Sequence, residues 1–583
     1  MTCPLIVTQL PVGTDAERRG ATPGNVLRAP YGDGARLLLV LPNGETRVLS
    51  QGFHSACDPD VSFDASRILF AGKRATAEPW SIYEMAADGS GVRQITRDTG
   101  NCRSPGYQGT LYTIIAPGPW YQLTFVSDAA GALTDDASRV ATHLYSCRLD
   151  GTAARRLTFN VSGDSDPCVT PDGRLLYAAW QRSTLARGPL GRVGLFGVNT
   201  DGADCALFAA DEGRRVKHMP CVTTGGLAVF VEADQAPWDG AGALSCVTLR
   251  RPLHSYRRIT READGLFHSP SPLPDGGVLV SRRPRRGAAG HGVCRLDPAT
   301  GRAQLVFDDP AYHDIQAKAI HPRPEPDGRS SVVTEEDPNG KLYCLNVYVS
   351  DLPRRQWLPP GAARRVRVVE GVPLRAEAAL RLETRNSKHE TRLAPRRILG
   401  ETDIRADGSF NIEVPANAPL ELQLLDADGL ALRTCGWIWA KNHEARGCIG
   451  CHEDGELTPE NSFRAALDGP SVRLCPPVEG RRTVDFRRDI LPIVNAKCAP
   501  CHKGGDFPGR HVHPGTARTS PLIWRLLGRN ASRPWDGTCR SRPPSPMPPA
   551  GAAPLTADEK RAVAAWVDLG ATLDEPSMRE TQR

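Results

Sequence analysis

The sequence lacks any stretch of about 18 consecutive apolar residues, the length that a membrane-spanning helix needs. It also lacks a run of about five or six like charges, and its net charge is only +6 over 583 residues. These absences argue against a membrane span and against a nucleic-acid partner. The first residues, MTCPLIVTQLPVG, contain neither a basic segment nor the apolar segment of about 7 to 15 residues that an export signal has.

Glycine and proline are abundant, at 56 and 50 residues, beside 40% hydrophobic and 24% charged residues. That balance is too apolar for a disordered chain and indicates a turn-rich, mostly β protein. The length predicts roughly two to four domains. The 17 cysteines are an odd number at scattered spacings, so a disulfide framework is not indicated. We expect most of them to be small buried side chains in strands.

Residues 1 to about 350 contain an internal repeat of about 50 residues, in which a turn precedes a short apolar strand. Asp-Gly turns such as Asp172-Gly173 predict hairpins in these copies. Radial stacking of four-stranded copies predicts a β-propeller of six blades, or seven if the N-terminal strands close separately. The copies resemble TolB-type propeller blades in their SPDG-like and ADGS-like turns. Their first prolines are Pro59, Pro105, Pro167, Pro220, Pro270 and Pro322.

Two further domains are predicted after a propeller at residues 1–351. Between 352 and 470, apolar residues alternate from Phe410 and again from Leu420, which predicts a small β-rich domain. From 471 to 583 we expect helices, of which the last begins with a capping box at Thr556 and Glu559. The predicted fold is therefore multidomain and mainly β, with an α-helical domain at the end.

Two C-x-x-C-H motifs carry the chemistry of this sequence. Two thiols three positions apart on one turn can bond both vinyl groups of a haem, and the adjacent histidine can bind the iron. A zinc site shared by both motifs is the alternative, but the 46 residues between them exceed the usual spacing of a zinc ribbon. We therefore expect two covalently attached haems c, held by Cys448, Cys451 and His452 and by Cys498, Cys501 and His502.

The residues around the second motif resemble a class I-like cytochrome c domain. The similarity is carried by FRRDILPIVNAKCAPCH, SPLIWRLLG, an MPP sequence that starts at Met547, and LTADEKRAVAAWVDLGA. In that family the methionine of such an MPP segment supplies the sixth iron ligand. The resemblance thus makes Met547 the first candidate opposite His502, with His513 and His511 as alternatives.

The residues around the first motif, from RILGETD at Arg397 to CIGCHEDGELTPEN, resemble the middle domain of the hydrazine synthase α family. That family has a propeller, a middle domain with one c-type haem and a C-terminal domain with another. The resemblance does not carry the activity over. Our first hypothesis is a redox enzyme whose first haem binds a small nitrogen or oxygen compound while the second haem relays electrons. In hydrazine synthase, a tyrosine four positions after the motif histidine binds iron and the histidine turns to zinc. Glu456 holds that position here, so hydrazine formation is not expected.

Charged residues near the first motif are candidates for acid-base catalysis or for metal coordination. Glu453, Asp454 and Glu456 are the candidate catalytic carboxylates, and His452 binds haem iron or, as the alternative, zinc. His389, His443 and Glu444 are further candidates. The competing interpretation is that these side chains are solvated in a glycine-rich loop. In the propeller, His54, Cys57 and Asp58 offer a metal-ligand set, but we favour a blade turn with a packed cysteine.

The sequence thus predicts a periplasmic or otherwise exported dihaem protein with a redox partner protein and a small-molecule substrate. A non-enzymatic electron carrier that uses the propeller as a docking surface is the alternative. Because haem c is attached outside the bacterial cytoplasm, and no export signal is visible, we expect a missing or processed N-terminus.

Overall fold

A computed structural model of the protein describes residues 3–13, 31–114, 116–182, 190–286, 289–351, 354–375, 394–451, 453, 461–502 and 511–573. The chain divides into two compact units. Unit 1 consists of Met1–Gly131, Ala141–Trp180 and Arg192–Val333, and unit 2 consists of Ala132–Val140, Gln181–Gly191 and Thr334–Arg583. Two short segments from the first half of the chain therefore belong to the second unit.

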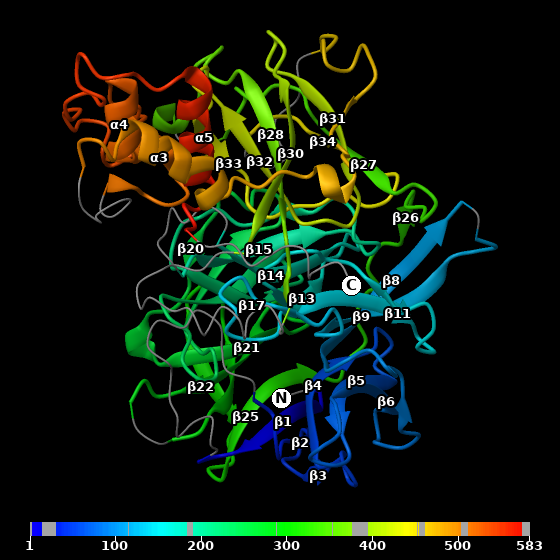
Figure 1. The fold of residues 1–583 in the computed structure, drawn as a ribbon. Coiled ribbons are helices and arrows are strands. Elements are labelled where there is room, and N and C mark those ends of the chain that lie inside the picture. Colours follow the sequence, from blue (N-terminus) through cyan, green and yellow to red (C-terminus); the bar gives the residue numbers. More distant parts are fainter. Residues whose placement is uncertain are drawn as a thin grey trace. The chain divides into compact units, whose positions relative to one another are not determined.

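Unit 1 is built from short antiparallel strands that follow one another along the chain (Figure 1). Its first sheets contain β4 (Ser55–Val61), β5 (Arg67–Lys73), β6 (Ser81–Ala86) and β7 (Arg93–Gln94), then β8 (Cys102–Thr113), β9 (Trp120–Ser127), β11 (His143–Arg148) and β12 (Arg155–Arg156). The next sheet contains two groups of strands. The first group is β13 (Asp164–Val169), β14 (Leu175–Gln181), β15 (Arg192–Val198) and β16 (Ala206–Leu207), and the second is β17 (Val216–Val222), β18 (Leu227–Ala233), β19 (Ala243–Thr248) and β20 (Arg257–Arg258).

After the 3-10 turn η1 (Glu262–Asp264) come β21 (Leu266–Pro272), β22 (Val278–Arg283), β23 (Gly292–Leu296) and β24 (Ala303–Phe307). The last sheet has the order β25 (Tyr312–Ala319), β1 (Leu5–Pro11), β2 (Arg36–Val40), β3 (Thr46–Val48). Because β25 pairs with β1, this sheet joins the two ends of unit 1. β26 (Arg329–Ser331) adds to β8 in parallel. The described N-terminal strands thus join β25 and form no sheet of their own.

The first strands of these groups form a closed ring. β4, β8, β13, β17, β21 and β25 contact one another in that order, and β25 contacts β4 (Figure 1). Each ring strand has a register shift at its bulge. The bulge residues all have positive φ, from 46° to 56°, which is uncommon for residues other than glycine. They are Asp58, Ser104, Asp166, Met219, Ser269 and Gln316.

Proline follows five of the six bulge residues, at the positions that the repeat predicted. The prediction that the sixth copy starts at Pro322 was wrong, because the bulge of β25 lies at Gln316 and is followed by Ala317. The sixth bulge is held by side-chain hydrogen bonds of Gln316, whose amide Nε2 donates to Asp58 and to the hydroxyl of Tyr31 at 2.9 Å. Proline is therefore dispensable at this position.

Buried aromatic side chains fill unit 1 at matching places in the second strand of successive groups. Phe70, Phe125, Tyr177 and Phe230 are each no more than 1% exposed. The expectation of buried cysteines in strands is confirmed for Cys57, Cys102, Cys147, Cys221, Cys246 and Cys294. The apolar alternation seen in the sequence is therefore the packing pattern of these sheets.

Unit 2 contains two four-stranded sheets. One has the order β30 (Arg396–Asp403), β28 (Arg365–Gly371), β32 (Leu420–Leu425), β33 (Ala431–Thr434), and the other has the order β34 (Ala445–Cys448), β27 (Asn339–Cys344), β31 (Phe410–Pro415), β35 (Val472–Arg473). β10 (Ala132–Leu133) pairs with β29 (Leu374–Arg375). The alternation predicted from Phe410 is confirmed, since Phe410, Ile412 and Val414 are all buried. The alternation predicted from Leu420 was wrong, because Glu421 and Gln423 of β32 are buried too. β27 lies before the predicted boundary at 351, and the boundaries 1–351, 352–470 and 471–583 stay predictions.

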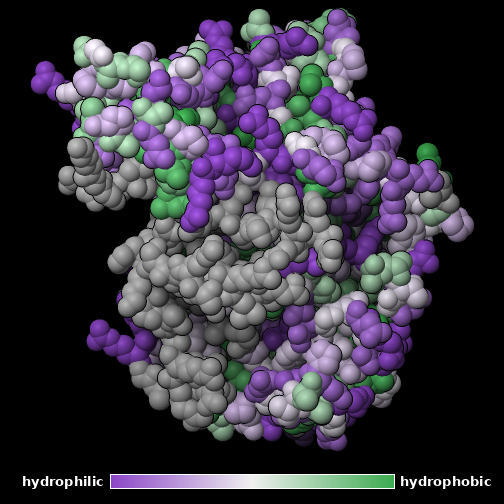
Figure 2. All heavy atoms as spheres, in the orientation of Figure 1, coloured by the Kyte–Doolittle hydropathy of each residue, from purple (hydrophilic) through white to green (hydrophobic). Residues whose placement is uncertain are grey.

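Short helices follow in unit 2: η2 (Arg354–Gln356), η3 (Val478–Gly480), the π-helical turn η4 (Phe486–Ile490), α3 (Leu491–Lys497), η6 (Ala517–Thr519), α4 (Pro521–Leu527) and α5 (Ala557–Asp568). The capping box is confirmed, because Thr556 and Glu559 exchange side-chain to backbone hydrogen bonds at 3.1 and 2.7 Å. Trp566 and Val567 of α5 are buried in one core with Leu430. No helix among the described residues has the length and apolar character to cross a membrane, and many of the residues that are coloured in Figure 2 are hydrophilic.

Candidate functional site

Main-chain contacts hold the first C-x-x-C segment at the edge of a sheet in unit 2. β34 pairs in parallel with β27, which places Cys448 beside Cys344. Beyond the strand, the Cys451 N–H donates to the Val349 carbonyl at 2.8 Å. A Cβ on Gly450 would lie 2.3 Å from that carbonyl oxygen, so only glycine fits at position 450.

The two thiols of the first motif lie in different environments. Cys448 is exposed, whereas Cys451 is half-buried and packs against the same apolar cluster as Trp535. Burial raises the pKa of the Cys451 thiol to about 11, although the nearby Arg433 guanidinium opposes this. Cys451 is therefore a neutral thiol at pH 7, with one side against the core.

Several residues predicted beside this motif lie outside the described part of the chain: His389, His452, Asp454 and Glu456. Glu453 is described and half-buried. His443 lies 3.1 Å from Asp337 through Nδ1, and its ring is largely exposed. Glu444 is buried, and its Oε2 accepts the Lys441 N–H at 2.6 Å. His443 and Glu444 therefore stabilise the turn before β34.

Two buried tryptophans precede the first motif. Trp437 and Trp439 are 0% and 1% exposed. The Arg396 guanidinium lies 5.1 Å from the centre of the Trp437 ring, and a Cβ on Gly371 would lie 2.6 Å from that ring. Trp437 thus packs between a strand backbone and a cation, and Gly371 leaves room for its ring.

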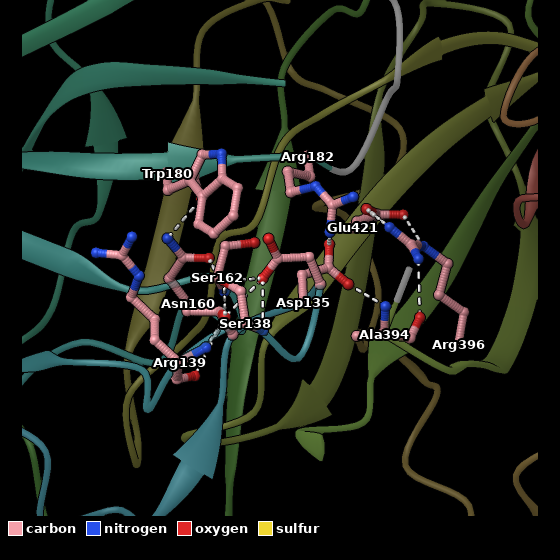
Figure 3. Close-up of polar contacts among 12 residues, drawn as sticks. Asp135, Ser138, Arg139, Asn160, Ser162, Trp180, Arg182, Ala394, Arg396 and Glu421 are labelled. Carbon is pink, nitrogen blue, oxygen red and sulfur yellow. Dashed lines mark hydrogen bonds and ion pairs between the residues drawn. The ribbon is translucent and has the colours of Figure 1, made fainter. Parts of the chain in front are cut away.

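Arg396 also belongs to a buried group of charges that no sequence motif marks (Figure 3). Arg396 and Glu421 form an ion pair at 3.3 Å, and Arg182 lies 3.9 Å from Asp135. Asp135 also accepts the Ala394 N–H. All four charged side chains are at most 4% exposed. They tie the segments Ala132–Val140 and Gln181–Gly191 to the sheet of β28, β30 and β32 in unit 2.

The second motif follows the C-terminal end of α3. Cys498 caps this helix, and its carbonyl accepts the N–H groups of Cys501 at 3.2 Å and His502 at 3.0 Å. Cys498 is half-buried, whereas Cys501 and His502 are exposed. The motif therefore forms a turn that has a thiol at each end and a solvent-accessible imidazole.

The candidate sixth ligands of the second motif differ in their contacts. Met547 is half-buried, and its N–H donates to the Arg525 carbonyl of α4 at 2.9 Å. His513 Nδ1 lies 3.1 Å from the Thr519 hydroxyl, and the His513 N–H donates to Ser520 Oγ at 2.9 Å. His511 is half-buried. The His513 ring is thus already hydrogen-bonded, whereas Met547 is held in place by a main-chain hydrogen bond.

No group of three or more His, Cys, Asp or Glu side chains is arranged to hold a metal ion within the described ranges, which omit His452. In unit 1, Arg103 pairs with Asp58 at 2.6 Å, and His54 Nδ1 lies 2.8 Å from Ser55 Oγ. Cys57 is fully buried. Asp58 is thus paired with an arginine and Cys57 is packed in the core of unit 1.

Comparisons with known proteins agree on one family. Residues 361–453 match the family described as the hydrazine synthase alpha subunit middle domain. The chain is 26% identical to hydrazine synthase subunit alpha of Kuenenia stuttgartiensis over 730 aligned positions, which cover 93% of this chain and 88% of that protein. The solved Kuenenia stuttgartiensis hydrazine synthase has a TM-score of 0.78 at 24% identity, covering 98% of this chain and 95% of that one. The chain is thus similar to hydrazine synthase subunit alpha over most of its length, and its residues 361–453 match the middle domain of that family.

The family resemblance predicted from CIGCHEDGELTPEN is thus confirmed. The matched part of this hydrazine synthase alpha-like chain ends at Glu453 and so includes Cys448 and Cys451. The chain also has a weaker similarity to TolB from Acinetobacter baumannii, at 13% identity and a TM-score of 0.37 over 54% of this chain and 65% of that one.

Proposed function

We propose that this chain is a dihaem c-type cytochrome protein that carries out redox chemistry in the periplasm or another exported location. The observation that carries the proposal is the pair of C-x-x-C-H sequences in one compact unit. The proposal includes a six-bladed propeller in unit 1, supported by the closed ring of β4, β8, β13, β17, β21 and β25.

The donor atoms fit haem c at both places. Cys448 and Cys451 would hold the first haem and Cys498 and Cys501 the second, with His452 and His502 as iron ligands. In each pair one thiol is exposed and the other half-buried, as expected for a group with one edge in solvent and one against the core. A bound haem supplies an iron that exchanges single electrons.

The first site is proposed to be the reactive one, and its substrate is a small nitrogen or oxygen compound. The support is the hydrazine synthase alpha-like sequence from 361 to 453. Glu453, Asp454 and Glu456 are the proposed carboxylates that hold or move protons there. Because Glu456 takes the position at which the resemblance puts a tyrosine, the proposed reaction is not hydrazine formation. Zinc at His452 is the alternative occupant.

The second site is proposed to relay electrons to or from a redox partner protein. Trp535, from the C-terminal helical part, packs against the apolar cluster that Cys451 also contacts. This packing supports a fixed arrangement of the two motifs in unit 2. A relay needs such an arrangement, because electron transfer depends on a constant separation of the two centres.

The alternative function is electron carriage alone, with unit 1 as the docking surface. Exposed apolar side chains near the ends of β8 and β9 favour it, since such a group is typical of an interaction surface. They are Tyr112 at 42% exposure, Ile114 at 89% and Tyr121 at 45%.

Optical and EPR spectra of the purified, haem-loaded full chain distinguish these functions. A high-spin first haem with an open iron position is the result expected for the enzyme. Low-spin, six-coordinate iron at both sites would assign the chain to electron carriage. A protein exported by cells that attach haem c, yet devoid of haem absorption, would overturn both.

A further inference from the structure

A cavity of about 440 Å³ lies in unit 1, between the segment that follows β20 and the sheet of β21 to β24. We call it the arginine pocket, because three arginines and one carboxylate line it. They are Arg261, Arg282, Arg302 and Asp264. The volume falls in the range of about 300 to 1,000 Å³ that is typical of small-molecule sites.

Two of these arginines meet at the turn η1. The Arg261 N–H donates to Asp264 Oδ2 at 2.8 Å, which fixes the start of the turn. A Cβ on Gly265, at the end of the turn, would lie 3.1 Å from Arg282 Nε. The Arg282 side chain, which comes from β22, therefore lies against the turn that Arg261 begins.

The third arginine comes from the turn between β23 and β24. Arg302 follows Gly301, and its carbonyl accepts the Asp297 N–H at 3.0 Å. A Cβ on Gly301 would lie 2.5 Å from the Ile259 carbonyl oxygen, so this turn touches the chain two positions before Arg261. Main-chain contacts thus fix the segments that carry all three arginines.

The positive charges of the arginine pocket are not compensated within the protein. Among the described residues, no carboxylate lies within ion-pair distance of the guanidinium groups of Arg261, Arg282 or Arg302. Neighbouring arginines of the same sheets do have such a carboxylate: Arg258, Arg283, Arg285 and Arg295. Three guanidinium groups and the one carboxylate of Asp264 give the lining a net charge of +2. The pocket therefore attracts anions.

The fold of the repeat does not require these arginines. The contact between the turn and the preceding strand recurs between Gly151 and Ile95 and between Gly202 and Leu157. In those two copies Arg302 corresponds to Thr152 and Ala203, and Arg261 corresponds to Arg97 and Phe159. Neither of these copies has arginine at both positions, so the pair is a feature of this pocket alone among the three.

We propose that the arginine pocket binds a small multivalent oxyanion, a compound with two or more phosphate or carboxylate groups. A guanidinium group donates two parallel N–H bonds to either of these groups, and three guanidinium groups can hold two of them. Asp264 can accept a hydroxyl or amine of the same ligand. Ile259, Phe267 and Ala303 line the apolar part of the pocket. The proposal concerns unit 1 alone and does not depend on haem.

Titration calorimetry of the haem-loaded full chain tests this site with diphosphate, citrate and acetate at one ionic strength. We expect diphosphate or citrate to bind at least about tenfold more tightly than acetate, because only a multivalent anion contacts several guanidinium groups. Tighter binding of diphosphate would assign a phosphorylated compound, and tighter binding of citrate a polycarboxylate. Arg261→Gln and Arg302→Gln should each weaken the binding of the tighter anion by about tenfold or more.

The repeat supplies a matched control. Arg97→Gln removes the same charge at the corresponding exposed position of another copy and should leave anion binding within a few-fold of the parent protein. The proposal is overturned if acetate binds as tightly as both multivalent anions, if neither of them binds at millimolar concentration, or if binding survives in both pocket variants. It is also overturned if Arg97→Gln weakens binding as much as they do. Circular dichroism identifies any loss of fold, and the pocket variant that keeps its fold then decides the matter.

Discussion

The carboxylate of Asp568 accepts a hydrogen bond from the Ala431 N–H at 3.0 Å. Its other oxygen accepts the Ala517 N–H at 2.7 Å, and Arg518 donates to the Ala431 carbonyl at 2.9 Å. Asp568 is the last residue of α5 and is buried. One side chain thus joins β33 of the sheet to the helical residues that follow the second C-x-x-C-H motif.

Asp568→Ala should destabilise unit 2, because it leaves two buried N–H groups without an acceptor. At about 1 to 3 kcal/mol for each unsatisfied group, we expect the free energy of unfolding to fall by about 3 kcal/mol. Denaturant unfolding followed by tryptophan fluorescence measures this. Asp558→Ala, on the exposed face of the same helix, is the control and should change stability by less than about 0.5 kcal/mol. Equal effects of the two variants would contradict the role given to Asp568.

Met547→Ala should leave haem attachment intact but raise the spin state of the second haem and lower its reduction potential. The reason is that a thioether ligand favours ferrous iron. His513→Ala is the matched test of the alternative, and it should change little because Thr519 already contacts that ring. Optical spectra and redox titration measure both properties. The reverse pattern would assign the sixth position to histidine.

The first haem should be high-spin and should bind carbon monoxide or nitric oxide once reduced. The reason is that an iron with one open face can bind a small molecule. The carboxylates Glu453, Asp454 and Glu456, which can move protons, are nearby in the sequence. Difference spectra of the reduced protein measure gas binding. We also expect no hydrazine from nitric oxide and ammonium. A low-spin first haem that is inert to both gases would leave electron carriage as the function.

If His452 binds zinc, Glu456 becomes the candidate iron ligand. In that case Glu456→Gln should change the spectrum of the first haem alone, because an amide is a weaker ligand than a carboxylate. Glu479→Gln, an exposed control, should change neither haem. Zinc analysis of the pure protein accompanies the spectra, and a spectral change without zinc would instead place Glu456 near a histidine-ligated iron.

Asp314 should lower the stability of unit 1 as the pH rises from about 4 through 7, a contribution that is opposed by the buried His143, whose pKa burial lowers to about 4. Burial raises the pKa of this carboxyl group from 3.8 to about 7, although Gln9 donates to it at 2.8 Å. Between these values the folded state binds more protons than the unfolded state, so the free energy of unfolding decreases with pH by at most about 1.4 kcal/mol per unit.

Asp314→Asn should reduce this pH dependence, since the amide does not titrate. Thermal unfolding midpoints between pH 4 and pH 8 measure the effect, and Asp234→Asn, an exposed control, should keep the slope of the parent protein. Relative to the parent protein, an unchanged slope in Asp314→Asn would contradict the assignment.

The repeat in unit 1 was largely predictable, and the reason lies in its local signals. Pro59, Pro105 and their counterparts each follow a bulge residue, so proline marks five ring strands in the sequence. The sixth bulge, at Gln316, carries no such mark, because its contacts come from Asp58 and from β1 near the start of the chain. Contacts between distant segments leave no periodic pattern in the sequence. The repeat therefore points to Pro322 rather than to Gln316 as the sixth position.

The two C-x-x-C-H motifs could be found from the sequence for the same reason, since their thiols are three positions apart. The buried charges of unit 2 could not be found in this way. Asp135 and Ala394 are 259 positions apart, and Asp568 and Ala431 are 137 apart. An isolated aspartate in a loop or at a helix end resembles an ordinary surface residue until folding places a buried N–H beside it.

Covalent haem attachment is the central claim and has the most direct measurement. The chain is produced with an export signal in cells that attach haem c, denatured in acid and extracted with organic solvent, and the protein mass is then determined. We predict two haems retained per chain, one retained when Cys498 and Cys501 are both changed to alanine, and one when Cys448 and Cys451 are. Haem that passes into the solvent, or zinc found in its place, would contradict the account.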